Sequence, residues 1–299
     1  MRDPTKTAAS GALDQAYQAC ITLAQDHYEN FSVVTRFVPK ERLPHVAALY
    51  AYCRTVDDLG DEAEGDRLRL LDEWQADLER CYSGTPEHPY LLALQQTTRA
   101  FDIPPEPLLK LVTANRMDQR QGRYATYDDL LRYCDHSANP VGRLYLYLLG
   151  YRDEERQLLS DSTCTALQLA NFWQDVRRDH TMGRVYLPVE DLERFAVPEA
   201  TLGGDIATDA FRRLMAFEVE RARGLFEDGL ALARRVDGID RLHLRLFTLG
   251  GLRVLDAIRG QGYDVLRKRP VVTGRRKAWL LLRTYVTMKL SGDLRRRGK

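Results

Sequence analysis

Residues 50–62 read YAYCRTVDDLGDE, an aromatic and apolar segment that runs directly into three aspartates and a glutamate. Spacings of three and four residues place side chains on one stripe of a helix. That stripe consists of Tyr50, Arg54, Asp57 and Asp61, with Asp58 beside it. Carboxylates at this spacing repel one another and raise each other's pKa. The pattern therefore predicts a helix that is buried at one end and needs a counter-charge at the other.

A divalent cation would remove this repulsion. Mg²⁺ takes oxygen ligands, accepts one or two protein carboxylates, and shares its remaining positions with water and phosphate. Arg54, one turn before the aspartates, is suited to bind a phosphate oxygen through its forked guanidinium. The alternative for this cluster alone is an acidic helix end exposed to solvent.

A second stripe of similar character lies at residues 166–179, ALQLANFWQDVRRD. Spacings of three, four and four residues align Gln168, Asn171, Asp175 and Asp179. The loop that follows, HTMGRVYLP, carries Arg184 and Tyr186, which are suitable donors for diphosphate oxygens. Two such helices, face to face, would hold Mg²⁺ ions that bind a diphosphate and stabilise it as a leaving group. The two stripes together are far more specific than either one.

The composition of the whole chain narrows the class of protein. The 299 residues include 44 basic and 43 acidic side chains, a balance that argues against a general nucleic-acid binder. Five scattered cysteines without a CxxC pair favour free thiols in a reducing compartment. No signal peptide and no run of about 18 apolar residues is present, so we expect a soluble cytoplasmic protein.

Helical periodicity is common along the chain, and strand signals are nearly absent. The segments with helical periodicity begin at Pro44 and continue at 67–81, 90–101, 107–121, 127–134, 140–150, 154–179, 209–235, 241–261 and 277–290. No repeat or long linker divides them. We therefore predict one all-α domain that spans residues 1–299.

The two acidic motifs, YCRTVDDLGDE and NFWQDVRRD, resemble those of the squalene and phytoene synthase family, from about Tyr17 to Arg276. This resemblance implies a single-domain isoprenoid synthase fold, with helices around a central apolar cavity and Mg²⁺-diphosphate sites at its mouth. The metal ligands that it implies are Asp57, Asp58, Asp61, Asp175 and Asp179. The residues that it places on the substrate or its diphosphate are Tyr50, Arg54, Gln168, Asn171, Arg184, Tyr186 and Arg269.

Three departures from the usual family pattern indicate a branch. They are the Glu29-Asn30-Phe31 opening, the Asn139-Pro140 step in SANPVGR, and Gln174 in place of an arginine. This combination resembles the bacterial hydroxysqualene synthases of hopanoid biosynthesis. These enzymes convert presqualene diphosphate and water to hydroxysqualene, without NADPH. The nearest alternative is condensation of two farnesyl diphosphates to presqualene diphosphate, squalene, dehydrosqualene or phytoene. An alternative of another class is a non-catalytic isoprenoid-binding or assembly partner.

The resemblance also implies roles for single residues, each with a plainer alternative. Tyr133 matches a tyrosine near the reacting carbons, where an aromatic face stabilises a carbocation; alternatively it is a packed core tyrosine. Asn139 is our candidate for holding the water that captures the cation, since a buried water typically needs two to four hydrogen-bond partners. Arg269, in GYDVLRKRP, either reaches the diphosphate or belongs to a solvated helix end.

The C-terminal segment RRKAWLLLRTYVTMKLSGDLRRRGK is basic and amphipathic. Its apolar residues either close the core or rest on an anionic membrane surface, where an insoluble product must leave. The second alternative predicts a peripheral protein on the inner face of the membrane.

Overall fold

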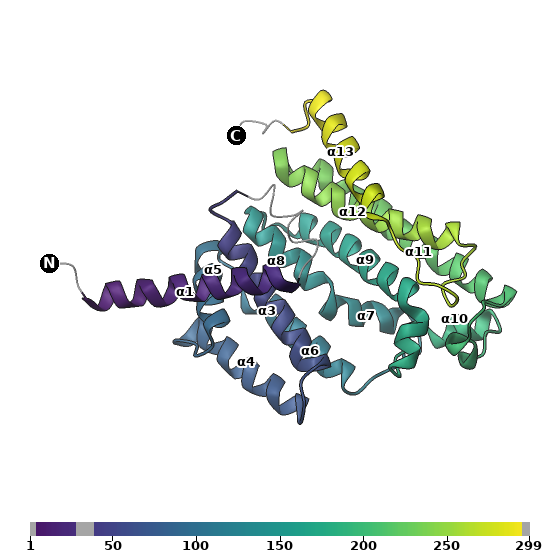
Figure 1. Ribbon diagram of the computed structural model, residues 1–299, viewed down its shortest axis with the longest axis horizontal. Helices are drawn as coiled ribbons and strands as arrows, with labels where there is room; N and C mark the ends of the chain where they lie inside the picture. Colours follow the sequence, from purple (N-terminus) through teal and green to yellow (C-terminus); the bar gives the residue numbers. More distant parts are fainter. Residues whose placement is uncertain (1–3, 28–38, 295–299) are drawn as a thin grey trace. The chain divides into compact units, whose positions relative to one another are not determined.

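A computed structural model describes residues 4–27 and 39–294, and the ordered elements in these ranges are helices (Figure 1). One isolated bridge pairs Arg123 with Val185. The predicted all-α class is confirmed. The elements are α1 (Pro4–His27), α3 (Leu43–Asp61), α4 (Arg67–Ser83), α5 (Pro89–Phe101), α6 (Pro105–Asp118), α7 (Tyr127–Ser137), α8 (Asn139–Leu149), α9 (Glu154–Thr181), α10 (Val189–Arg194), the 3₁₀ helix η1 (Glu199–Gly203), α11 (Asp209–Arg234), α12 (Gly238–Gly260) and α13 (Gly274–Leu290).

Every segment with predicted helical periodicity is a helix, with ends that differ from the prediction by a few residues. Capping residues account for several of these ends. Asp153 precedes α9 and its side chain accepts from the backbone N–H of Arg156. Thr126 and Asp129 form a reciprocal capping box at the start of α7. The Glu29-Asn30-Phe31 opening and Arg295–Lys299 lie outside the described residues.

The chain divides into two compact units. The first comprises residues 1–120 and 143–152, and the second comprises residues 121–142 and 153–299. The division falls inside α8. The expectation of one domain over the whole chain stays a prediction.

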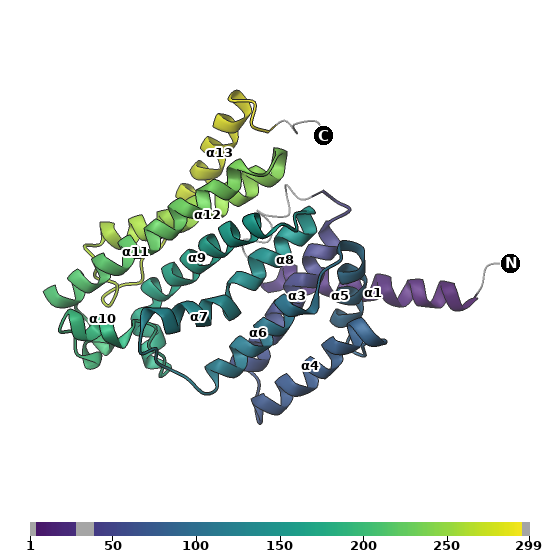
Figure 2. The same ribbon diagram turned by 180° about the vertical axis from the view of Figure 1, so that it is seen from behind.

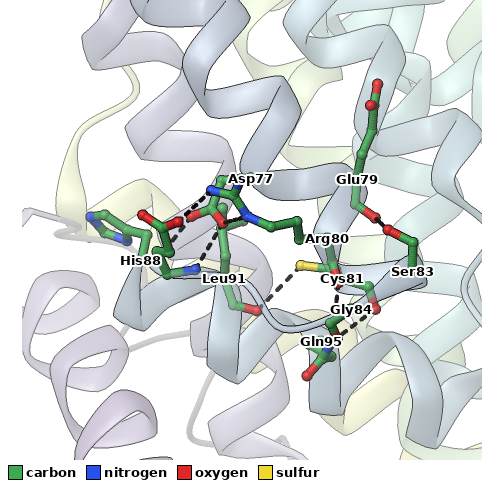
Figure 3. A network of polar contacts seen from close by, with 10 residues as sticks. Asp77, Glu79, Arg80, Cys81, Ser83, Gly84, His88, Leu91 and Gln95 are labelled. Atoms are coloured by element: carbon green, nitrogen blue, oxygen red, sulfur yellow. Dashed lines mark hydrogen bonds and ion pairs between the residues drawn. The ribbon is translucent and has the colours of Figure 1, made fainter.

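In the first unit, α3 contacts α1, α4, α5 and α6, and these helices lie together in both views (Figures 1 and 2). A cluster of buried apolar side chains that includes Tyr52, Leu78 and Leu94 joins α3, α4 and α5. The turn between α4 and α5 is fixed by the buried carboxylate of Asp77, which accepts from the backbone N–H groups of residues 87 and 88 (Figure 3). This packing holds α3, which carries the first acidic stripe.

In the second unit, α9 packs against α11 and α12, and α7 also contacts α9. The close approach of α11 to α9, and of α12 to α11, depends on glycine residues. A Cβ on Gly229 would lie 2.0 Å from Thr163 Oγ1, and one on Gly251 would lie 2.1 Å from Phe226. α13 contacts α12. The core of this unit therefore surrounds α9, the helix that carries the second stripe.

None of the helices in the described part of the chain combines the length and the apolar character needed to cross a membrane.

Candidate active site

The first stripe carries its own counter-charge. Arg54 Nη2 lies 2.6 Å from Asp58 Oδ1 and 2.9 Å from Glu62 Oε1, so one guanidinium joins the charged end of α3. Tyr50 is half-buried one turn earlier, and burial, more than its charged neighbours, raises its pKa. The predicted diphosphate contact Arg54 thus lies among the acidic residues, in an ion pair with Asp58.

The carboxylate of Asp57 lies next to a side-chain amide that belongs to another helix. Asn115 on α6 donates its Nδ2 to Asp57 Oδ1 at 3.3 Å. Gly60 makes this approach feasible, because a Cβ there would lie 2.0 Å from Asn115 Oδ1. The side chain of Asp57 is exposed to solvent, yet desolvation by the surrounding protein atoms raises its pKa to about 6; the hydrogen bond from Asn115 opposes this rise and the charge of Asp61 adds to it. Sequence reasoning missed Asn115; the glycine inside an acidic helix end was the available signal.

The second stripe obtains its counter-charge from a distant segment. Arg269 donates Nε to Asp175 Oδ1 at 2.6 Å and Nη2 to Asp175 Oδ2 at 2.8 Å. Asp179, one turn later, has its pKa raised to about 7, first by burial and then by the charge of Asp175, against the lowering effect of Arg178, Arg184 and Arg269. Both carboxylates therefore lie near the cations predicted to bind diphosphate.

The loop after α9 is fixed by backbone pairing with residues 122–125. The N–H of Val185 donates to the carbonyl of Gly122 at 2.8 Å, and the N–H of Val189 donates to that of Tyr124 at 2.9 Å. The N–H of Arg184 returns to the carbonyl of Asp179 at 2.8 Å. This pairing places Arg184 directly beside the end of the second stripe.

An aromatic cluster adjoins this end of α9. Tyr186 stacks on Phe172 with ring centroids 3.7 Å apart and an interplanar angle of 7°. Tyr133, 4% exposed, lies 5.8 Å from Tyr186 and 5.4 Å from Tyr124 between ring centroids. A small pocket beside the cluster is lined by Phe172, Val176, Asp179, Val185, Tyr186, Leu187 and Leu202. A carboxylate and aromatic rings therefore line the same pocket. Tyr124 and Phe172 were not among the predicted site residues.

Asn139 begins α8 and is buried. Its Oδ1 accepts a hydrogen bond from Thr165 Oγ1 on α9 at 2.9 Å. Nearby, α8 and α9 are in close contact at Gly142, where a Cβ would lie 2.4 Å from both Cys164 Sγ and Ser160 Oγ. The amide of Asn139 is therefore held in one orientation by α9.

The amide side chains on α9 differ in their exposure. Gln168 is half-buried and Asn171 is exposed. Gln174, one position before Asp175, is buried, and its Nε2 donates to the carbonyl of Pro270 at 2.7 Å.

The donor set fits Mg²⁺. In the described residues, no group of three or more His, Cys, Asp or Glu side chains converges as a preformed metal site. A Mg²⁺ ion that binds together with a diphosphate needs only one or two protein carboxylates, and each stripe offers hard oxygen ligands of that kind. Asp57 and Asp179 are carboxylates whose charged form is disfavoured without a cation, and bound Mg²⁺ would reverse that preference.

Known proteins resemble this chain in sequence and in fold. The sequence pattern described as squalene/phytoene synthase matches residues 24–276. The crystal structure of squalene synthase HpnC from Alicyclobacillus acidocaldarius is 46% identical, with a TM-score of 0.82 over 86% of this chain and 99% of that chain. A ligand-bound dehydrosqualene synthase is 25% identical, with a TM-score of 0.86 over 94% of this chain and 99% of that one. The 15-cis-phytoene synthase of Synechococcus elongatus is 31% identical over 92% of this chain and 93% of its own length.

Proposed function

Because the chain belongs to the squalene/phytoene synthase family, we propose that it is a Mg²⁺-dependent isoprenoid synthase that converts presqualene diphosphate and water to hydroxysqualene and diphosphate. Enzymes of this family act on prenyl diphosphates and join them head to head. The assignment to the hydroxysqualene reaction rests on the Asn139-Pro140 step, on Gln174 and on a comparison of sequence identities to three relatives. Identity is 46% to the protein named squalene synthase HpnC, against 31% to a phytoene synthase and 25% to a dehydrosqualene synthase.

The observation that carries the proposal is the pocket shared by Asp179 and Tyr186. A diphosphate that leaves beside Asp179 would generate a carbocation near the aromatic rings that line the same pocket. A cation over a desolvated aromatic face is stabilised by about 2 kcal/mol or more. The same pocket thus combines the two kinds of group that ionisation of a prenyl diphosphate requires.

In the proposed mechanism, the aspartates of the two stripes would hold Mg²⁺, which would supply positive charge to the diphosphate. Arg184 and Arg269, both in the second unit, donate to diphosphate oxygens, so that the C–O bond breaks with its electron pair on the leaving group. Tyr133 and Tyr186 present ring faces to the cyclopropylcarbinyl cation while it rearranges. Gln168 and Asn171 contribute amide groups on the polar side of α9.

Water then adds to the allylic cation, and the resulting oxonium ion gives one proton to the released diphosphate, so that the products are hydroxysqualene and protonated diphosphate. The amide of Asn139 is proposed to hold this water. Its oxygen already accepts from Thr165, which fixes the amide and leaves its Nδ2 to donate to the water. A buried water stays bound only where polar groups of this kind are available to it.

The test is product analysis with purified protein and Mg²⁺. Presqualene diphosphate should give hydroxysqualene without NADPH, and farnesyl diphosphate alone should give little C30 product. Efficient formation of presqualene diphosphate, dehydrosqualene or phytoene from prenyl diphosphates would reject the branch while the family assignment stands. Binding of these substrates without any turnover would instead favour the non-catalytic partner.

We also propose that α13 contacts an anionic membrane surface on the cytoplasmic side. Its buried side chains Leu280, Thr284 and Met288 form one stripe. The opposite stripe exposes large apolar groups, with Trp279 54% and Leu282 62% exposed, followed by Val286 and Leu290. The helix contains five basic residues and no acidic one. An exposed apolar stripe with basic flanks is typical of helices that lie in a membrane interface.

Vesicle sedimentation tests this contact. The full-length protein should bind vesicles that contain phosphatidylglycerol and not those of phosphatidylcholine alone, and Leu282→Ser should weaken binding. Binding unchanged in Leu282→Ser, or dimer formation that requires Leu282, would reject the membrane as the partner of this stripe.

A further inference from the structure

Residues 266–270 are bound along the last turns of α9 by three side chains of that helix. Gln174 donates to the carbonyl of Pro270 at 2.7 Å, and Arg177 Nη1 donates to the carbonyl of Leu266 at 3.3 Å. Between these two anchors, Arg269 donates to both oxygens of Asp175. Gln174 and Pro270 are buried, whereas the Arg269 side chain is 49% exposed. The backbone of this segment is therefore fixed, while the guanidinium has room to move.

The Arg269–Asp175 pair has a consequence for cation binding. The guanidinium fork uses both oxygens of Asp175, which is 14% exposed. A divalent cation that approaches the same carboxylate meets a positive charge already seated on it, so the two compete. Once displaced, Arg269 has lost its partner, and it stays next to the site because Gln174 and Arg177 hold its backbone.

We propose that Arg269 is an exchangeable counter-ion of Asp175, which links metal binding to diphosphate binding, and that Gln174 is the positioning residue that keeps it in place. Without ligands, Arg269 neutralises Asp175. When a divalent cation takes Asp175, the released guanidinium binds the diphosphate that accompanies the metal. This inference rests on the proposed function, since it assumes a diphosphate ligand.

Calorimetric titration of the full-length protein tests this linkage without any turnover. Mn²⁺ is titrated alone, and inorganic pyrophosphate is titrated at saturating Mn²⁺. In Arg269→Gln, Mn²⁺ alone should bind more tightly, and pyrophosphate should bind about tenfold more weakly, a size typical of coupling between sites. Arg269 is half exposed, so this variant is expected to fold.

A double-variant cycle tests the role of Gln174. Gln174→Leu should weaken pyrophosphate binding, and the variant with both changes should bind it no more weakly than Arg269→Gln alone. Such non-additivity is expected only if Gln174 acts through Arg269. The matched control is Gln95→Leu, which removes a buried amide that donates to the carbonyls of Cys81 and Gly84 in the first unit (Figure 3). It should leave both titrations unchanged.

The outcomes are distinguishable. Mn²⁺ affinity that is unchanged or lower in Arg269→Gln would overturn the counter-ion role. Additive losses in the double variant would overturn the positioning role of Gln174. If the wild-type protein bound neither Mn²⁺ nor pyrophosphate, the proposed function itself would fail, and this inference with it.

Discussion

Glu218 on α11 should contribute to the pH dependence of the protein's stability, and Glu218→Gln should remove that contribution. The side chain is fully buried. Burial raises its pKa from 4.5 to about 8; the charge of Arg221 opposes this rise, and Asp191 and Glu190 on α10 add to it. Arg221 Nη1 lies 3.5 Å from Glu218 but 2.9 Å from Asp191, and its guanidinium lies 3.9 Å from the ring centroid of Tyr127 on α7.

The sign follows from proton linkage. Between pH 4.5 and about 8 the folded protein keeps the proton on Glu218 while the unfolded chain releases it. Stability is therefore lost as pH rises through this window. At about 1.36 kcal/mol per pH unit, and with partial ionisation of the unfolded chain at pH 5, the loss from pH 5 to pH 7 is on the order of 2–3 kcal/mol. A glutamine does not titrate and can donate its amide to Asp191.

The assay is urea unfolding at pH 5, 6 and 7. The free energy of unfolding of Glu218→Gln minus that of the wild type should rise by roughly 2–3 kcal/mol over this range. Glu227→Gln makes the same chemical change at an exposed position of α11 and serves as the control. A difference for Glu218→Gln that is flat with pH, or no steeper than the control, would refute the assignment of a neutral buried carboxyl.

Three further predictions concern the site and its packing. Asp57→Asn and Asp175→Asn should abolish turnover at saturating Mg²⁺ and leave the fold intact by circular dichroism; near-normal product in both variants would reject the metal role. Asn139→Ala should shift product from hydroxysqualene to dehydrated or rearranged hydrocarbons, which added NADPH should not convert to squalene; an unchanged alcohol fraction by gas chromatography would exclude this residue as the water holder. Gly142→Ala should cost about 1–3 kcal/mol in urea unfolding, because the new methyl group overlaps α9. Gly224→Ala, where nothing lies within 4 Å, should cost nothing.

The helices were predictable wherever periodicity and breakers agreed. The segment predicted at 154–179 is α9, Glu154–Thr181, because the apolar positions recur over many turns and Asp153 caps the start. α10 has six residues, too few to show a period, and it was missed. α1 was also missed, because its apolar and polar residues do not segregate clearly to opposite faces.

Within the site, spacing predicts which side chains share one helix but not which distant groups meet them. Asn115 lies 58 residues from Asp57, and Arg269 lies 94 residues from Asp175. Both pairs depend on tertiary packing, which no local pattern encodes. The resemblance to a known family directed attention to Arg269 as a diphosphate contact, whereas the structure pairs it with Asp175.

The two acidic stripes, on α3 in the first unit and on α9 in the second, obtain their counter-charges in different ways. In the first unit, a guanidinium from the same helix pairs with Asp58, and the neighbouring Asp57 accepts an amide hydrogen bond. In the second, the guanidinium comes from a separate segment and pairs with Asp175. A counter-ion on the same helix moves with its carboxylate, so its contact changes little when ligands bind. A counter-ion on a separately anchored segment can exchange partners, and for this reason we place the linkage between metal and diphosphate at the second stripe.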